Sequence, residues 1–153
     1  MAISFVRIDD RVIHGQTMTR WATQRPLNAI LVISDAVAGD ELRKKVLRAA
    51  AGHFKIGIYT VAQGVEAKES PKNFFVISDT VEEFANLKKA GGDFGGVLNV
   101  GNIHASGGGA KNLGNAVVIG TEDVEAFDYL ASQGIDLQFQ LIPDNKVTAW
   151  PQI

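Results

Sequence analysis

The chain has 153 residues, of which 46% are hydrophobic and 21% charged, and this composition predicts one globular domain over residues 1–153. Its net charge of −2 offers no overall basic surface for nucleic acid, and no apolar run reaches the roughly 18–20 residues of a membrane span. The N-terminal residues do not form a secretion leader, and cysteine is absent, so we expect a cytoplasmic protein without disulfides, thiolate catalysis or cysteine-ligated zinc.

Short apolar runs alternate with amphipathic segments along the chain. The predicted strands are Ile3–Ile8, Ala29–Ile33, Lys55–Tyr59, Phe74–Ile77, Val97–Val100 and Val117–Ile119. Several are continuously apolar, as in a parallel sheet that is covered on both faces. Ile135–Ile142 alternates apolar and polar residues, which predicts a further strand near a sheet edge.

The segments between these strands carry helix signals. Helices are predicted over Gly15–Thr23 and Asp40–Ala51, and others begin at Thr60, Thr80 and Glu122. The spacing in the second helix predicts that Leu42, Val46 and Ala49 share its apolar face. The fold class predicted from this alternation is α/β: an open, doubly wound, mainly parallel sheet of about six or seven strands with helices on both faces.

Ligands of such sheets bind at the carboxyl ends of the strands. Asp9–His14, Ser34-Asp35 and Gly101–Asn112 each follow a predicted strand, so we expect these segments on one rim of the sheet. His14 then lies where the first strand turns into a helix, and unpaired N–H groups there favour an anion. Arg11 adds a forked, permanently charged donor on the same turn.

This arrangement suits a histidine that carries a phosphoryl group. A histidine is largely neutral and nucleophilic near pH 7, so a ring nitrogen of His14 can attack phosphorus. Arg11 would neutralise the phosphoryl oxygens in the transition state. One of Asp9 and Asp10 would orient the imidazole or Arg11, and the other would cap the turn.

The remaining charged residues and histidines carry weaker signals. Arg7, near the end of a buried strand, is interpreted as serving the sheet edge or a partner surface. His53 follows a helix end and is expected to be exposed to solvent. His104 follows the strand Val97–Val100 and is left open between a ligand contact and no role.

Metal and nucleotide sites are not predicted. Asp9, Asp10 and His14 are ligand types, but the chain has no H-E-x-x-H and no second clustered histidine. The stretch Gly107–Asn112 lacks the G-K-[ST] ending of a phosphate-binding loop. We therefore expect no metal and no cofactor.

The decapeptide from Arg7 to Gln16, followed by Trp21, resembles the opening of the IIB component of the bacterial sugar phosphotransferase system, mannose/fructose/sorbose family. Val12 stands where that family usually has leucine, and Thr17 where it usually has valine. The resemblance continues through Val32–Asp35, Asn99–Asn102 and Glu125–Phe127. Around Asn102 the chain is more similar to the N-acetylgalactosamine/galactosamine branch.

The resemblance implies a phosphocarrier. His14 would accept a phosphoryl group at Nδ1 from a IIA domain and pass it to a hexose or amino sugar held by a IIC/IID membrane pair. The chain would associate with that pair without entering the membrane, and the resemblance leaves a homo-oligomer open. Phosphate or substrate contacts are expected from Gly15, Gln16, Ser34, Asp35, Gly101, Asn102 and His104.

Two other classes of protein fit the same residues. A soluble sugar-phosphate hydrolase or isomerase would use His14 as a general acid or base, and would turn over without a protein donor. A non-catalytic regulatory module would bind an anion there without covalent phosphate.

Overall fold

The computed structural model describes residues 2–13, 29–52, 54–67, 73–104, 111–114, 117–140 and 146–150. The strands of this part are β1 (Ala2–Asp9), β2 (Ala29–Ile33), β3 (Ile56–Tyr59), β4 (Asn73–Ser78), β5 (Val97–His104), β6 (Lys111–Gly114), β7 (Val117–Ile119), β8 (Asp136–Phe139) and β9 (Thr148–Ala149). The helices are α2 (Asp35–Ala38), α3 (Glu41–Ala50), α4 (Val61–Glu66), α5 (Val81–Lys89) and α6 (Thr121–Ser132).

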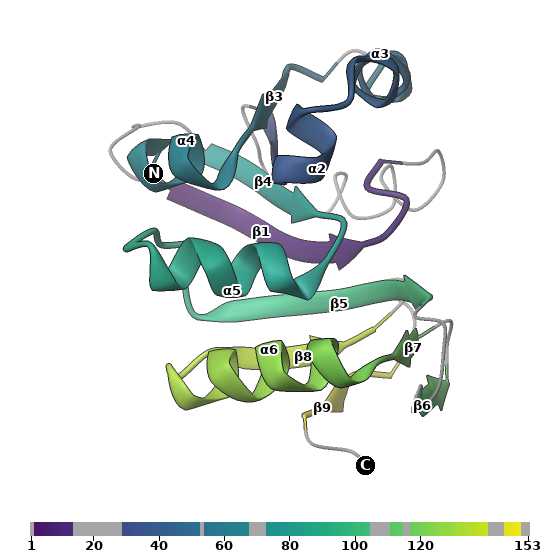
Figure 1. Cartoon of the computed structure of the whole chain (residues 1–153), viewed down its shortest axis with the longest axis vertical. Helices are drawn as coiled ribbons and strands as arrows, with labels where there is room; N and C mark the ends of the chain where they lie inside the picture. Colours follow the sequence, from purple (N-terminus) through teal and green to yellow (C-terminus); the bar gives the residue numbers. More distant parts are fainter. Residues whose placement is uncertain are drawn as a thin grey trace.

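The strands form one mainly parallel sheet (Figure 1). Its order is β3-β2-β4-β1-β5, all parallel, and the far edge of β5 pairs first with β8 and then with β7. Only the short outer strands β6 and β9 pair antiparallel to their neighbours among these elements. Because β1, β2, β4 and β5 run in the same direction, their carboxyl ends share one edge of the sheet.

Helices cover both faces of the sheet. Alternate residues of β1 enter two different clusters, with Val6 and Ile8 packing toward α4, α5 and α6, and Phe5 toward α2 and α3. Residues of a strand alternate between faces, so α2 and α3 lie on the face opposite α4, α5 and α6. The predicted doubly wound α/β architecture is confirmed.

Most helix starts follow the predicted capping residues. Asp40 and Thr80 accept hydrogen bonds from backbone N–H groups of α3 and α5, and Thr60 forms a capping box with Gln63 of α4. These side chains satisfy N–H groups that the first helical turn leaves without partners. The helix starts were therefore readable from the sequence.

The predicted apolar face of α3 is wrong. Leu42 is 73% and Val46 57% exposed, Ala49 is also exposed, and Leu47 is the residue that packs into the core. Of the residues of α3, Leu47 alone is buried. The three residues of the predicted apolar face therefore lie on the solvent side of the helix.

Other elements differ from the prediction in extent. β5 continues past Val100 through Gly101 to His104, a stretch that was predicted as a loop. The predictions did not include α2, β6 and β9. The predicted Gly15–Thr23 helix and His53 lie outside the described residues. No helix in the described part of the chain is long and apolar enough to cross a membrane.

Candidate functional site

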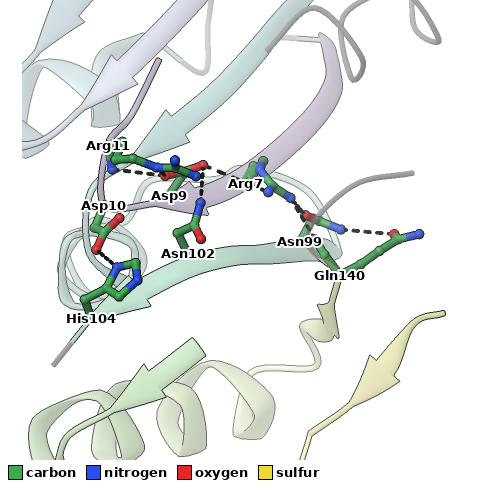
Figure 2. A network of polar contacts seen from close by, with 8 residues as sticks. All are labelled: Arg7, Asp9, Asp10, Arg11, Asn99, Asn102, His104 and Gln140. Carbon is green, nitrogen blue, oxygen red and sulfur yellow. Dashed lines mark hydrogen bonds and ion pairs between the residues drawn. The ribbon is translucent and has the colours of Figure 1, made fainter. Parts of the chain in front are cut away.

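The carboxyl ends of β1 and β5 lie side by side and carry a network of polar side chains (Figure 2). The pairing of the two strands shifts by one residue after Ile8, so Gly101 is an extra residue in β5. A bulge of this kind reverses the facing of the residues that follow it. Asn99 and Asn102, which would otherwise face opposite sides of the sheet, therefore both contact β1 on the same face.

Asp9 ends β1 and fixes the turn that follows. Its carboxylate is 1% exposed, and Oδ1 accepts a hydrogen bond from the Arg11 backbone N–H at 3.0 Å. Oδ2 accepts one from Asn102 Nδ2 at 3.2 Å, and the Asp9 carbonyl accepts one from the Val12 N–H at 2.8 Å. The turn that leads to His14 is therefore built on Asp9.

Val12 has a φ of 62°, which β-branched residues rarely adopt. Val12 and Ile13 are buried, and they belong to the same core cluster as Val37 and Leu47. Burial of these two side chains and the hydrogen bonds of the turn offset the backbone strain. The last described residues before His14 are thus anchored in the core.

Arg11 presents its side chain at the edge of this turn. Its guanidinium Nε lies 3.6 Å from Asp9 Oδ1, and the side chain is 48% exposed. Asp9 is therefore placed to orient Arg11, while the exposed part of the fork remains accessible to an anion.

Arg7 is the unexpected member of the network. It is 1% exposed and donates from Nη1 to Asn99 Oδ1 and, at 2.9 Å, to the Gln140 carbonyl. Burial lowers the pKa of Arg7 to about 10; the Asp9 carboxylate opposes this shift and the Arg11 charge adds to it. Arg7 is therefore cationic at neutral pH and offsets the buried charge of Asp9, whose Oδ2 lies 4.0 Å from its Nη2.

Gly101 makes room for this buried guanidinium. A Cβ on Gly101 would lie 2.0 Å from Arg7 Nη2 and 2.4 Å from Cζ. Both distances are well inside van der Waals contact, so only glycine permits this approach.

Asp10 contacts a different partner from Asp9. Its Oδ2 lies 2.5 Å from His104 Nδ1, and its backbone N–H donates to the Asn102 carbonyl at 3.0 Å. From the other side Arg43 Nη2 donates to the Asp10 carbonyl at 3.2 Å, while its Nη1 pairs with Asp79 at 3.1 Å. The turn after β1 is thus tied to β5 and α3 as well as to Asp9.

Ser34 and Asp35 follow β2, which β4 separates from β1. The Ser34 hydroxyl accepts a hydrogen bond from the Val37 N–H at 3.2 Å, and Asp35 Oδ1 accepts one from the Val61 N–H at 2.8 Å. Both side chains therefore cap helices, and their predicted role in binding phosphate or substrate stays a prediction.

The structure brings most of the predicted site residues together. The network of Figure 2 contains Asp9, Asp10, Arg11, Asn102 and His104. Gly101 lies close to the Arg7 guanidinium. His14, Gly15 and Gln16 lie outside the described residues, so their predicted roles are not tested.

The interpretation of Arg7 as serving the sheet edge or a partner surface is wrong, because Arg7 is buried in β1, which lies between β4 and β5. Sequence reasoning also missed three participants: Asn99, Gln140 and Arg43. A usable signal existed for Arg7 and Asn99. Each is a polar residue inside an apolar strand, and such a residue needs a buried partner.

Within the described ranges no three histidine, aspartate or glutamate side chains gather closely enough to hold a metal ion. The arrangement places the guanidinium of Arg11 on the turn that Asp9 caps at the carboxyl end of β1. A guanidinium at this place in a parallel sheet suits a phosphate or phosphoryl group.

The sequence model of the family "PTS system sorbose subfamily IIB component" matches residues 3–153. The chain belongs to this IIB family. The resemblance inferred from the decapeptide Arg7–Gln16 is confirmed.

The chain is similar to IIB components named for several sugars. It is 30% identical over 158 residues to the fructose-specific EIIB component of Bacillus subtilis, covering 100% of this chain and 96% of that protein. It is 33% identical over 147 residues to the mannose-specific EIIAB component of Escherichia coli, covering 93% of this chain but only 45% of that protein. The crystal structure of N-acetylgalactosamine-specific IIB component 1 from Escherichia coli matches with a TM-score of 0.88 and 27% identity, over 97% of this chain and 99% of that one.

Proposed function

We propose that this chain is a phosphocarrier that accepts a phosphoryl group on His14 and transfers it to a sugar. The IIB family match supports this proposal. The observation that carries it is the turn capped by Asp9, which presents Arg11 at the rim three residues before His14.

The chemistry follows from these positions. A ring nitrogen of His14 attacks the phosphorus of a donor phosphohistidine, and a phosphorus–nitrogen bond to His14 forms while the one to the donor breaks. The bond to His14 breaks in turn when the sugar hydroxyl attacks the phosphorus. Phosphoryl transfer depends mainly on positioning and on stabilising the charge of the equatorial oxygens. The fork of Arg11, oriented by Asp9, supplies that charge from a turn that is already ordered.

The partners follow from the role of a carrier. The donor is a histidine of a IIA domain, and the fusion of IIA and IIB in the mannose-specific relative supports this pairing. The acceptor is a sugar held by a membrane-embedded IIC/IID pair, which places the chain in the cytoplasm at the membrane surface. Both partners must reach the same rim in turn, so the interfaces are transient.

The sugar belongs to the hexoses or amino sugars. Relatives named for fructose, mannose and N-acetylgalactosamine match at similar identities of 27–33%. The membrane subunits therefore contribute most of the choice among these sugars.

The fate of the phosphate tests the proposal. The chain is labelled with ³²P from phosphoenolpyruvate through the general phosphotransferase proteins and a IIA domain, then mixed with vesicles that contain IIC and IID. Fructose, mannose, sorbose and N-acetylgalactosamine are offered in separate samples. A carrier yields labelled sugar phosphate in at least one sample, in proportion to the label lost by the chain. Release of inorganic phosphate alone would indicate a hydrolase, and a chain that never takes up label would indicate a binding module.

A further inference from the structure

Asp10 and His104 form a pair at the rim that the proposed function does not use. His104 Nδ1 lies 2.5 Å from Asp10 Oδ2, and the histidine side chain is 57% exposed. In Figure 2 the two side chains point toward one another from the adjacent ends of β1 and β5. Asp10 belongs to the same turn as Arg11, so the pair lies on the rim that carries Arg11.

The contact fixes the tautomer of the histidine. An ionised carboxylate can only accept a hydrogen bond, so Nδ1 of His104 must carry the hydrogen. The lone pair of the neutral ring is then on Nε2, the atom turned away from Asp10. A histidine oriented in this way by a carboxylate is equipped to accept a proton at Nε2.

We propose that His104, held by Asp10, takes the hydroxyl proton of the sugar as the phosphoryl group leaves His14. This inference rests on the proposed phosphoryl transfer. The sugar oxygen forms a bond to phosphorus while the phosphorus–nitrogen bond to His14 breaks, and that electron pair returns to the His14 ring. The hydroxyl proton moves to Nε2 of His104, and the resulting imidazolium is balanced by the Asp10 carboxylate.

The surrounding charges favour this role for Asp10. The Asp9 carboxylate is engaged with Arg11, Arg7 and Asn102, whereas Asp10 Oδ1 is buried with no hydrogen-bond partner in the described part of the chain. Arg43 reaches the Asp10 backbone carbonyl and pairs its charge with Asp79. The Asp10 side-chain charge is thus available to a protonated His104.

The two half-reactions of a phosphocarrier separate this role from a structural one. Transfer from a IIA histidine to His14 involves no hydroxyl group, so it needs no proton acceptor. Transfer from His14 to a sugar releases one hydroxyl proton. A residue that only shaped the turn before His14 would affect both steps, and a proton acceptor affects the second alone.

The test measures both steps in single turnovers. The variants are His104→Ala, His104→Gln and Asp10→Asn, with His53→Gln as a matched histidine control and Asp136→Asn as a control carboxylate at the amino end of β8. We expect the His104 variants to accept phosphoryl from IIA at the unaltered rate. Their transfer to sugar, in vesicles with IIC and IID, falls about 10²-fold, the low end of the usual contribution of a general base. Asp10→Asn lowers the sugar step by a smaller factor, because the amide keeps a hydrogen bond but loses the charge.

Two further readouts are specific to proton transfer. Free imidazole restores the sugar step of His104→Ala, and the limb of the pH–rate profile that reports a base is lost in His104→Gln. An unchanged sugar step in the His104 variants would overturn the inference while leaving the phosphocarrier intact. Equal losses in both steps, without rescue by imidazole, would also overturn the inference. They would indicate that Asp10 and His104 only hold the turn in place. Failure of the unsubstituted chain to accept phosphoryl would instead contradict the proposed function.

Discussion

At the scale of single residues, the two aspartates after β1 have separate tasks that the sequence left open. Asp9 caps the turn and holds Arg11, and Asp10 holds His104. The sequence pointed to both aspartates because they follow a strand and precede His14. It could not assign them, because their partners on β5 are more than 90 residues away in the chain.

Substitution of Arg11 tests its role in the transition state. Arg11→Lys keeps the charge but loses the fork, while the backbone N–H that Asp9 caps is unaffected. Phosphoryl transfer should slow by about 2.7–4 kcal/mol in barrier height, the usual cost of losing a donor to developing charge. The melting temperature should change little, as measured by thermal unfolding. Full transfer activity in Arg11→Lys would remove Arg11 from the site.

A methyl group on Gly101 tests the buried Arg7 network. Gly101→Ala would force the guanidinium from its partners, and overpacking of this kind costs about 1–3 kcal/mol. Gly96→Ala is the matched control, because a Cβ at that residue meets no atom within 4 Å. Urea unfolding should show a loss of stability for the first variant and little change for the second. Equal stability of the two variants would show that Arg7 does not need this space.

At the scale of elements, continuous apolar runs predicted the buried strands well, and β2 has the predicted bounds. β5 was cut short at Val100 because Gly101, Asn102 and His104 are typical loop residues. In the structure they serve the bulge and its contacts with β1. Local sequence patterns cannot predict this part of β5, because the contacts that stabilise it are made with residues of β1 and the turn that follows it.

The orientation of α3 gives a second test at this scale. Leu47→Ala should cost about 2–5 kcal/mol of unfolding free energy, because Leu47 is 3% exposed in the core below α2 and α3. Leu42→Ala on the same helix should have little effect, since that side chain is 73% exposed. Chemical denaturation of the two variants checks the difference. A larger loss in Leu42→Ala would restore the face predicted from the sequence.

At the scale of the whole molecule, pH acts on stability at a place away from the rim network. Glu82 in the first turn of α5 is hydrogen-bonded to Asp123 in the first turn of α6. Burial raises the pKa of Glu82 to about 7, and the hydrogen bond and the charges of Asp123 and Glu122 add to the shift. The folded chain therefore holds a proton that the unfolded chain releases near pH 4.5.

This pKa shift predicts the sign of a pH effect. The contribution of Glu82 to stability is fully present below about pH 4.5 and is lost as the pH rises through about 7. Glu82→Gln cannot ionise, so its stability relative to the unsubstituted chain should increase between pH 5 and pH 8. Urea unfolding of both proteins at the two pH values measures this difference. A constant or falling difference would contradict the shift.

The central claim is that His14 carries the phosphoryl group, and intact mass measures this most directly. The chain is incubated with phosphoenolpyruvate, the general phosphotransferase proteins and a IIA domain. Its intact mass is then measured by mass spectrometry under alkaline conditions that preserve phosphohistidine. We predict a gain of one phosphoryl group, about 80 Da, that is lost in acid. His53→Gln and His104→Gln should gain the same mass, and His14→Gln should gain none. Acid-labile phosphate on His14→Gln would contradict the account.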